Sequence, residues 1–257
     1  YRDGLTGQIH ESDFWKFWDK REDFFASMQG KNRVLACSRT AKYLAMVFID
    51  ESWVPSDGVG LFSFCEFSSF SVMQSSVHET WARQQSGKLE QRLTYNFSKT
   101  FSTFPWPKSY SIDEVGERFY SLRSKYCENN ACCITDMYNA FHDEARTDVD
   151  LAEVRAHFIK LDSEVLRAYG WDDIDLDHGF RDVTYLAKND CRRFTIAEHA
   201  RVEILNRVAE LNHRHHKEES EQSQKNKPQS SRPTKRRRSE KGTSQITLSD
   251  LFDGDGE

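Results

Sequence analysis

The stretch FSKTFSTFPWPKS, residues 97–109, constrains the fold more than any other part of the chain. Proline fixes its φ angle and donates no backbone hydrogen bond, so Pro105 and Pro107 cannot lie inside a helix or a central strand. Each proline also pushes the residue before it, Phe104 or Trp106, into an extended conformation. The sequence therefore predicts a stiff aromatic hinge between two parts, with Phe104 and Trp106 packed against the sheet as anchors.

Upstream of the hinge, the hydrophobic pattern alternates between helical and strand periods. One apolar face predicts an amphipathic helix over residues 11–29, formed by Phe14, Phe17, Trp18 and Phe25. Short apolar runs predict strands at residues 33–39, 43–49 and 59–65. A further helix with a buried face is indicated by the spacing of Phe70, Met73, Val77 and Trp81. We therefore expect residues 1–107 to form an α+β module with a small antiparallel sheet.

Downstream of the hinge, the pattern becomes helical. Two capping-box patterns predict helix starts, at Ser111-x-x-Glu114 and Thr195-x-x-Glu198. The apolar spacing predicts helices that run to about Asn129, over residues 148–169 with Gly170 as the C-terminal cap, and over residues 196–219. An acidic loop is expected at residues 171–180. Residues 108–219 are therefore predicted to be a mainly helical domain, which makes the fold class of the whole chain α+β.

The last part of the chain, residues 220–257, has almost no large apolar side chains until its end. Such a segment cannot offset its own ordering entropy, and we expect a disordered basic and polar tail. The closing QITLSDLF resembles the short peptides by which DNA-processing proteins bind sliding clamps, through Gln245, Leu248, Leu251 and Phe252. A chance apolar ending is the alternative, because short motifs have many false positives.

The common catalytic motifs are missing from the sequence. It has no phosphate-binding loop, no dinucleotide fingerprint, no nucleophile elbow and no zinc-protease helix. The six cysteines fit no disulfide framework or metal pattern, and we expect free thiols and no metal site. His213 and His216 are better explained as cations at a helix end, and the aspartates of residues 172–177 as a solvated loop. No apolar run is long enough to span a membrane, so these patterns favour a cytoplasmic binding protein over an enzyme.

Four long segments occur in an order that identifies a family. They are FWKFWDKREDFFASMQGKNRVLACSRTAKYLAMVF, FSFCEFSSFSVMQSSVHETWARQQSGKLEQRLTYNFSKTFSTFPWP, LRAYGWDDIDL and RFTIAEHARVEILNRVAELNHRHHKEE. Over residues 11–219 the chain resembles the C-terminal part of MmeI-like restriction–modification proteins of types IIG and IIL. FSTFPWP is similar to the signature that closes the target recognition domain of that family, so the resemblance implies that the hinge ends that domain.

The resemblance also implies a function for the parent protein. Full-length members of the family carry a nuclease domain, a helical connector and an adenine-N6 methyltransferase domain that uses S-adenosylmethionine, and DNA cleavage implies Mg²⁺. The target recognition domain reads double-stranded DNA for both activities, which serve phage defence in prokaryotes. This chain lacks the catalytic parts, so we expect a fragment or a free-standing remnant whose missing partner is the methyltransferase domain. The chain begins with Tyr1, which favours the fragment.

If the module binds duplex DNA, a chain of net charge −5 must gather its cations on one face. The candidate DNA-binding residues are Arg39, Lys42, Arg83, Lys88, Arg92 and Lys99. Gln84, Gln85 and Asn96 lie between them, and Arg, Gln and Asn are the side chains that read guanine and adenine edges. The alternatives are an ordinary basic surface, or a protein–protein interaction module that no longer binds DNA. Trp81 is expected in the core and not as a wedge between bases, and Phe104 and Trp106 as packing anchors and not stacking platforms.

Overall fold

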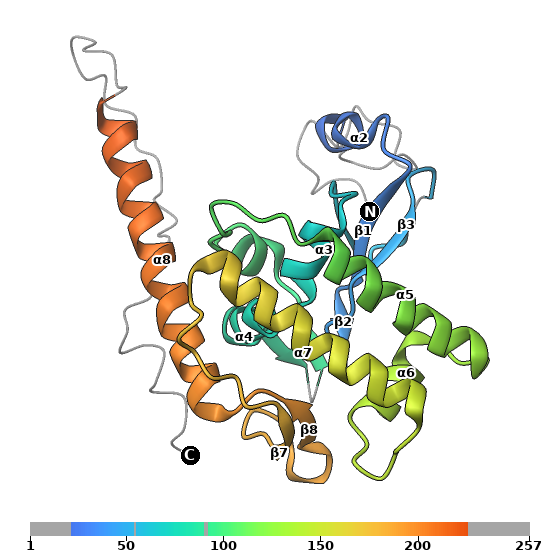
Figure 1. Cartoon of the computed structure of the whole chain (residues 1–257). Coiled ribbons are helices and arrows are strands. Elements are labelled where there is room, and N and C mark those ends of the chain that lie inside the picture. The colour runs from blue at the N-terminus through green and yellow to red at the C-terminus, as the bar shows by residue number, and fades with distance from the viewer. Residues whose placement is uncertain (1–21, 54, 90–91, 226–257) are drawn as a thin grey trace, which may run out of the picture.

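The computed structural model describes residues 22–53, 55–89 and 92–225 (Figure 1). Its helices and strands, in chain order, are α2 (Glu22–Met28), β1 (Arg33–Ser38), β2 (Thr40–Ala41), β3 (Val47–Asp50), β4 (Val59–Phe62), α3 (Phe67–Gln74), α4 (Ser76–Gln85), β5 (Gly87–Leu89), β6 (Arg92–Thr94), the π-helix η1 (Phe97–Phe101), α5 (Asp113–Asn129), α6 (Ile134–Phe141), α7 (Val149–Tyr169), β7 (Gly179–Asp182), the 3₁₀-helix η2 (Lys188–Asp190), β8 (Arg192–Thr195) and α8 (Glu198–Lys225). The expected α+β class is confirmed.

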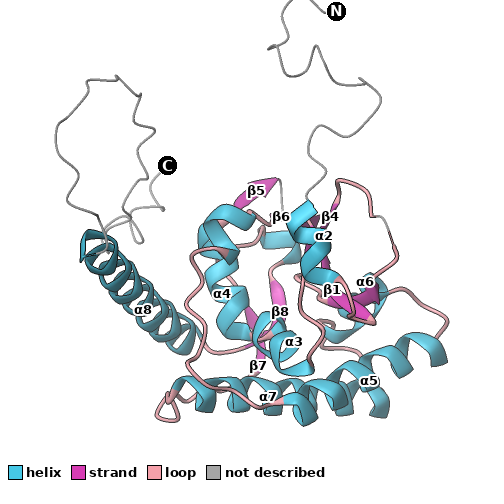
Figure 2. Ribbon diagram, turned by 90° about the horizontal axis from the view of Figure 1, so that it is seen from above, coloured by secondary structure: helices cyan, strands magenta, loops and turns pink. Residues whose placement is uncertain are grey.

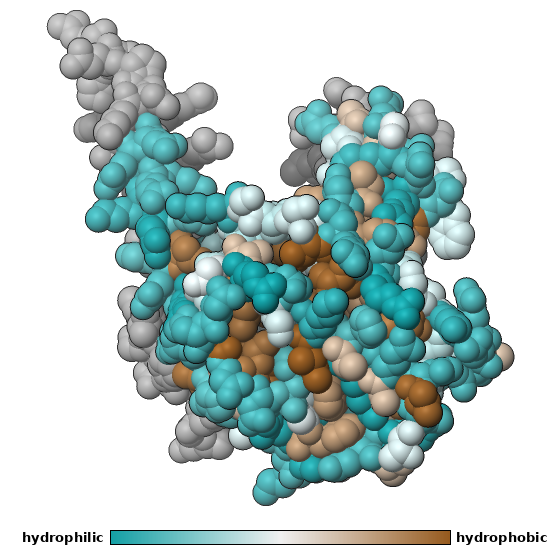
Figure 3. Space-filling model, viewed as in Figure 1, coloured by the Kyte–Doolittle hydropathy of each residue, from teal (hydrophilic) through white to brown (hydrophobic). Residues whose placement is uncertain are grey.

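Three small antiparallel sheets carry the strands. The first has the order β3-β1-β4, the second β2-β6-β5, and the third is the hairpin β7-β8. Helices α3 and α4 lie at the centre, with α5 and α7 on one side and the β5–β6 hairpin on the other (Figure 2). Helix α8 projects from this body, and hydrophilic residues cover its far end (Figure 3).

The aromatic hinge packs onto both parts of the chain. Phe104 is buried with its ring centroid 4.8 Å from that of His78, and Trp106 packs against Phe64 at 5.1 Å. On the other side, the Tyr169 hydroxyl of α7 donates a hydrogen bond to the Pro105 carbonyl oxygen (2.9 Å). Trp81 is buried and donates its indole N–H to the Thr100 carbonyl oxygen. The predicted anchoring role of these rings agrees with their contacts.

Two carboxylates from the C-terminal helices bind the starts of α3 and α4. Asp113 of α5 accepts hydrogen bonds from the backbone N–H (2.8 Å) and hydroxyl (2.6 Å) of Ser68. Asp162 of α7 does the same for Ser76, at 2.7 and 2.6 Å, and also contacts Nε2 of His178 at 2.8 Å. Orphan N–H groups at helix starts need such acceptors. One hydrophobic cluster, from Leu35 to Val208, accordingly runs through both sides of the hinge.

Several sequence predictions need correction. The helix expected from Phe70 to Trp81 is two helices, because Ser75 is extended (φ −70°, ψ 160°) and caps α4. The strand expected at 43–49 begins only at Val47. Ser111 does not cap α5, whose N-cap is Ile112 without a side-chain hydrogen bond. Helix α6, the β7–β8 hairpin and the continuation of α8 to Lys225 were not predicted.

Other predictions agree with the structure or lie beyond it. Helix α7 and its left-handed C-cap Gly170 (φ 72°) are confirmed, as is the end of α5 at Asn129. The apolar residues expected at 14–18 and those of the tail after residue 225 lie outside the described residues. No described helix is long and apolar enough to cross a membrane.

Candidate nucleic-acid interface

The sheet β2-β6-β5 gathers part of the predicted basic set. Arg39 lies between β1 and β2, where its carbonyl oxygen accepts a hydrogen bond from the N–H of Tyr95 (2.7 Å). Arg92 begins β6, whose residues Leu93 and Thr94 pair with Ala41 and Thr40. Both arginines are exposed. The antiparallel pairing therefore brings two cations, distant in sequence, to one small sheet.

Two further lysines of the predicted set lie in neighbouring elements. Lys88 lies in β5, and its Cα pairs with that of Leu93. Lys99 is exposed on η1, and its backbone N–H donates a hydrogen bond to Oδ1 of Asn96 (3.1 Å). Asn96 thus caps η1 and fixes the position of Lys99 relative to β6. We call Arg39, Arg92 and Lys99 the exposed cation set.

Arg83 does not share this surface. Its side chain is only 13% exposed, and its guanidinium lies 2.6 Å from the Glu79 carboxylate. Its Cζ also lies 4.8 Å from the ring centroid of Tyr185. The i, i+4 spacing with Glu79 and the cover provided by Tyr185 direct the charge into the protein. Arg83 therefore links α4 to the loop before β8.

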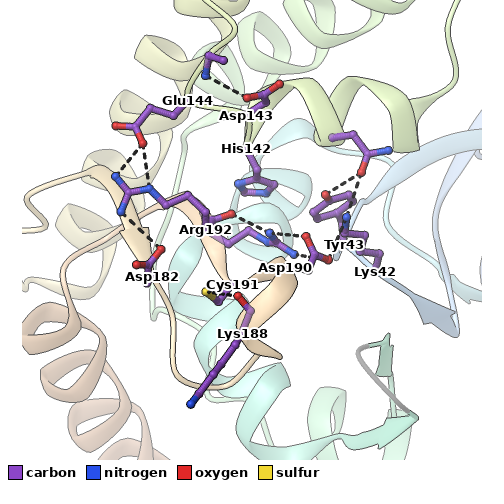
Figure 4. Close-up of a pocket in the computed structure, with 13 residues that line it drawn as sticks. Lys42, Tyr43, His142, Asp143, Glu144, Asp182, Lys188, Asp190, Cys191 and Arg192 are labelled. Atoms are coloured by element: carbon purple, nitrogen blue, oxygen red, sulfur yellow. Dashed lines mark hydrogen bonds and ion pairs between the residues drawn. The ribbon is translucent and has the colours of Figure 1, made fainter.

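Lys42 lies at the edge of a cleft of about 790 Å³ between the two parts of the chain (Figure 4). Its Nζ is 3.0 Å from a carboxylate oxygen of Asp190 and 3.2 Å from Oδ1 of Asn139. Asp190 also binds Arg193 (3.1 Å), which is 5% exposed. Since the Lys42 amine already has two partners, it belongs to an internal ion-pair network more than to the open surface.

The cleft contains a histidine, His142, whose ring is packed and hydrogen-bonded. The pKa of His142 is held well below its usual value, first by burial and then by the charges of nearby Arg193 and Arg83. Its Nδ1 accepts a hydrogen bond from the backbone N–H of Phe194 (3.2 Å), and its ring stacks on Tyr43 at 5.0 Å. His142 is thus a packing residue of the cleft wall, and its environment disfavours the protonated ring.

The cleft walls carry both signs of charge, which pair with one another. Arg192 binds Glu144 (2.7 Å) and approaches Asp182 (3.5 Å), in addition to the Lys42–Asp190–Arg193 contacts. Sequence reasoning missed these partners because no motif marks them. In residues 22–225, apart from the undescribed positions 54 and 90–91, no three His, Cys, Asp or Glu side chains are grouped to hold a metal ion.

Comparisons with known proteins agree with the resemblance found in the sequence. Residues 17–108 match the family described as "MmeI, target recognition domain". A solved structure of the type IIL restriction–modification enzyme MmeI in complex with DNA is 24% identical, over 56% of this chain and 19% of that chain. The TM-score between that structure and this chain is 0.46. No curated protein matches the chain. This chain is therefore similar, over residues 17–108, to the target recognition domain of MmeI.

Proposed function

We propose that the chain reads a DNA sequence on behalf of a restriction–modification protein. The observation that carries the proposal is the match of residues 17–108 to the MmeI target recognition domain. The chain spans 19% of the length of the solved MmeI structure to which it is similar. The activities of a complete enzyme of this kind are accordingly assigned to parts beyond this chain.

The sheet β2-β6-β5 is the surface we assign to the DNA. Strands β5 and β6 form a two-stranded antiparallel ribbon, an element that B-DNA admits into its major groove. Arg92 lies on this ribbon, and Arg39 and Lys99 flank it. Cations in these positions supply phosphate contacts, which give affinity, while arginine can also bind guanine bidentately, which gives specificity.

The two members of the predicted set that form ion pairs with acidic side chains have a different role in this proposal. Arg83 is paired with Glu79, and Lys42 is paired with Asp190. Lys88 remains a candidate DNA-binding residue by its position in β5. We therefore expect the substitution of Arg83 to change stability and not the binding of phosphates.

The catalytic functions belong to the parent in this proposal. An adjoining methyltransferase domain would bind S-adenosylmethionine and modify adenine, and cleavage would need Mg²⁺. The chain alone should transfer no methyl group from labelled S-adenosylmethionine to duplex DNA. Robust incorporation of label would contradict this assignment.

Selection from random duplexes tests sequence reading. The full chain is incubated with a pool of duplexes that contain a randomised segment, at about 50 mM salt to favour phosphate contacts, and bound DNA is amplified over several rounds. We expect enrichment of one short consensus. Binding without a consensus would mean that the chain holds DNA but does not read it, and no binding would mean that the chain does not recognise DNA at all.

A protein-interaction module is the second candidate, and one observation favours it. Trp53 is 64% exposed beside a groove of about 410 Å³ whose walls include Pro55, Ile134 and Tyr138. The partner in that case is the methyltransferase domain of the parent. Trp53→Ala should then weaken binding of that purified domain to the chain, without any effect on duplex binding.

The clamp-binding peptide remains a separate proposal. Gln245, Leu248, Leu251 and Phe252 lie outside the described residues. A peptide of residues 241–257 should bind the sliding clamp of the host, and a peptide with Leu251→Ala and Phe252→Ala should not. Equal binding of the two peptides would remove the proposal.

A further inference from the structure

The end of α5 has a backbone geometry that brings two specific residues together. The N–H of Cys132 donates to the Cys127 carbonyl oxygen (3.0 Å), and the N–H of Ala131 donates to the Glu128 carbonyl oxygen (3.2 Å). Ala131 has a left-handed conformation (φ 47°). These three features define a Schellman motif, in which the side chains of the first and last residues meet in a contact that is usually hydrophobic.

Here both of the residues that meet are cysteines. Burial, together with the neighbouring Cys132 thiol, raises the pKa of the Cys127 thiol to about 11. Both cysteines are free and partly exposed. Residues joined by a direct backbone hydrogen bond have Cα atoms roughly 5.5 Å apart in an antiparallel pair and about 6.2 Å apart in an α-helix, and both distances are within the range that a disulfide spans.

The neighbouring Cys133 has a different partner. Its thiol donates a hydrogen bond to Oδ2 of Asp136 (3.0 Å) at the start of α6, where the pair forms a capping box. The Cys133 thiol is thus bound to the first turn of α6, and Cys133 is exposed. The backbone of Cys132, in contrast, is hydrogen-bonded to Cys127 in the last turns of α5. Of the cysteines at this corner, the geometry therefore selects the pair Cys127 and Cys132.

We propose that Cys127 and Cys132 form an oxidation site, at which a peroxide converts the two thiols into a disulfide that joins the end of α5 to the start of α6. The thiolate of Cys132 attacks one peroxide oxygen and becomes a sulfenic acid, with release of water from hydrogen peroxide. The sulfur of Cys127 then attacks the sulfenic sulfur, forms the S–S bond and releases a second water. Overall, two thiols and one hydrogen peroxide give one disulfide and two waters.

The order of attack follows from the environment of each thiol. Cys127 has a raised pKa and stays protonated near pH 7, so it is a poor first nucleophile. As the resolving residue it needs only to be close to the sulfenic sulfur, since its proton leaves with the departing hydroxyl. Reduction by a thiol such as dithiothreitol reverses the bond.

Mass spectrometry of the oxidised chain provides the test. The full chain is treated with a small excess of hydrogen peroxide, blocked with iodoacetamide, and digested with trypsin and a glutamyl protease. Trypsin leaves the three cysteines of this corner on one peptide, and the glutamyl protease cuts that peptide after Glu128, between Cys127 and Cys132. We expect fragments from either side of the cut to remain joined until dithiothreitol is added.

Three single variants decide which thiols react. Cys133→Ser should leave the crosslink intact, and Cys127→Ser should abolish it and leave a sulfenic acid at residue 132 that a dimedone probe captures. Cys132→Ser should abolish both the crosslink and the captured sulfenic acid. Because Cys127→Ser and Cys132→Ser give different expected products, the loss of the crosslink can be interpreted even if one of the two variants does not fold. Two separate alkylated fragments in the wild-type chain, or a crosslink that depends on Cys133, would overturn the proposal.

Discussion

The contact of Asp162 with α4 and His178 makes the strongest prediction about stability. The Asp162 side chain is 1% exposed and accepts hydrogen bonds from the N–H and hydroxyl of Ser76 at 2.7 and 2.6 Å. It also lies 2.8 Å from Nε2 of His178, whose side chain is 2% exposed. Asp162→Ala therefore leaves the two donors of Ser76, and one histidine nitrogen, buried without an acceptor.

The expected cost follows from these contacts. A hydrogen bond to a charged group contributes roughly 1.5–3 kcal/mol, and each donor left buried without an acceptor costs about 1–3 kcal/mol. Because the three contacts share one carboxylate, their energies do not add fully, and we expect the free energy of unfolding to fall by about 3–5 kcal/mol. In a chain of this size such a change lowers the melting temperature by roughly 6–20 °C.

Urea unfolding followed by circular dichroism measures this change. The matched control is Asp150→Ala, a change of the same side chain on the same helix at an exposed position. We expect that control to change the free energy of unfolding by less than about 1 kcal/mol. A decrease below about 1 kcal/mol in Asp162→Ala as well would refute the view that the C-terminal helices hold α4 in place through this carboxylate.

Three further predictions concern the fold. A Cβ at Gly116 would overlap Ser71 Oγ and lie 2.6 Å from the Phe67 carbonyl oxygen. Gly116→Ala should therefore lower the free energy of unfolding, measured in urea, by roughly 1–3 kcal/mol. The control Gly58→Ala should lower it little, because the nearest atom to a Cβ at Gly58 is 3.7 Å away. Burial lowers the pKa of His78 to about 4. Because the unfolded chain binds this proton at a higher pH than the folded chain does, the free energy of unfolding should fall by about 1.5 kcal/mol as the pH drops from about 6.5 to about 5. His78→Gln should flatten this pH dependence, and an unchanged pH dependence in that variant would contradict the buried neutral histidine. Arg83→Ala should lower the melting temperature and leave the salt dependence of duplex binding unaltered, and the reverse result would return Arg83 to the DNA surface.

The parts of the fold that were predicted correctly bury a periodic face over many residues. Helix α7 has such a face along its whole length, from Leu151 to Leu166, and its end is marked by a glycine. Strand β1 is a continuous apolar run with a partner on each side. Local sequence suffices in these cases because the same residues decide both the period and the burial.

The incorrect predictions depend on partners that are distant in the chain. Residues 43–46 are as apolar as a strand, but Gln74 supplies their hydrogen bonds, since its side chain binds the Met46 N–H (2.8 Å) and the Leu44 carbonyl oxygen (3.0 Å). Arg123, 1% exposed, adds a bond to the Met46 carbonyl oxygen. Side chains thus replace a neighbouring strand, and no local pattern reveals such a replacement.

The candidate interface was predictable as a class of residues and not as a surface. Spacing indicated a basic set, and the antiparallel pairing of β2 with β6 does bring Arg39 and Arg92 to the same small sheet. The set also included Arg83 and Lys42, whose acidic partners Glu79 and Asp190 direct them elsewhere. Glu79 is four residues from Arg83 and could have been suspected from the sequence, whereas Asp190 comes near Lys42 only through the fold.

The salt dependence of duplex binding tests the central claim most directly. One triple variant replaces the exposed cation set, with Arg39→Ala, Arg92→Ala and Lys99→Ala. A control triple variant of equal net charge carries Arg118→Ala, Lys125→Ala and Lys160→Ala on α5 and α7. These two helices lie on the other side of α3 and α4 from β5 and β6 (Figure 2). Fluorescence anisotropy with a labelled duplex gives the dissociation constant between about 50 and 200 mM salt. We predict that the first variant weakens binding and reduces the slope of log K against log salt by about 0.9 for each phosphate that is no longer bound, while the control keeps the wild-type slope. Equal slopes in the wild-type chain and the first variant, or equally weakened binding in both variants, would contradict the assignment of DNA to the sheet β2-β6-β5.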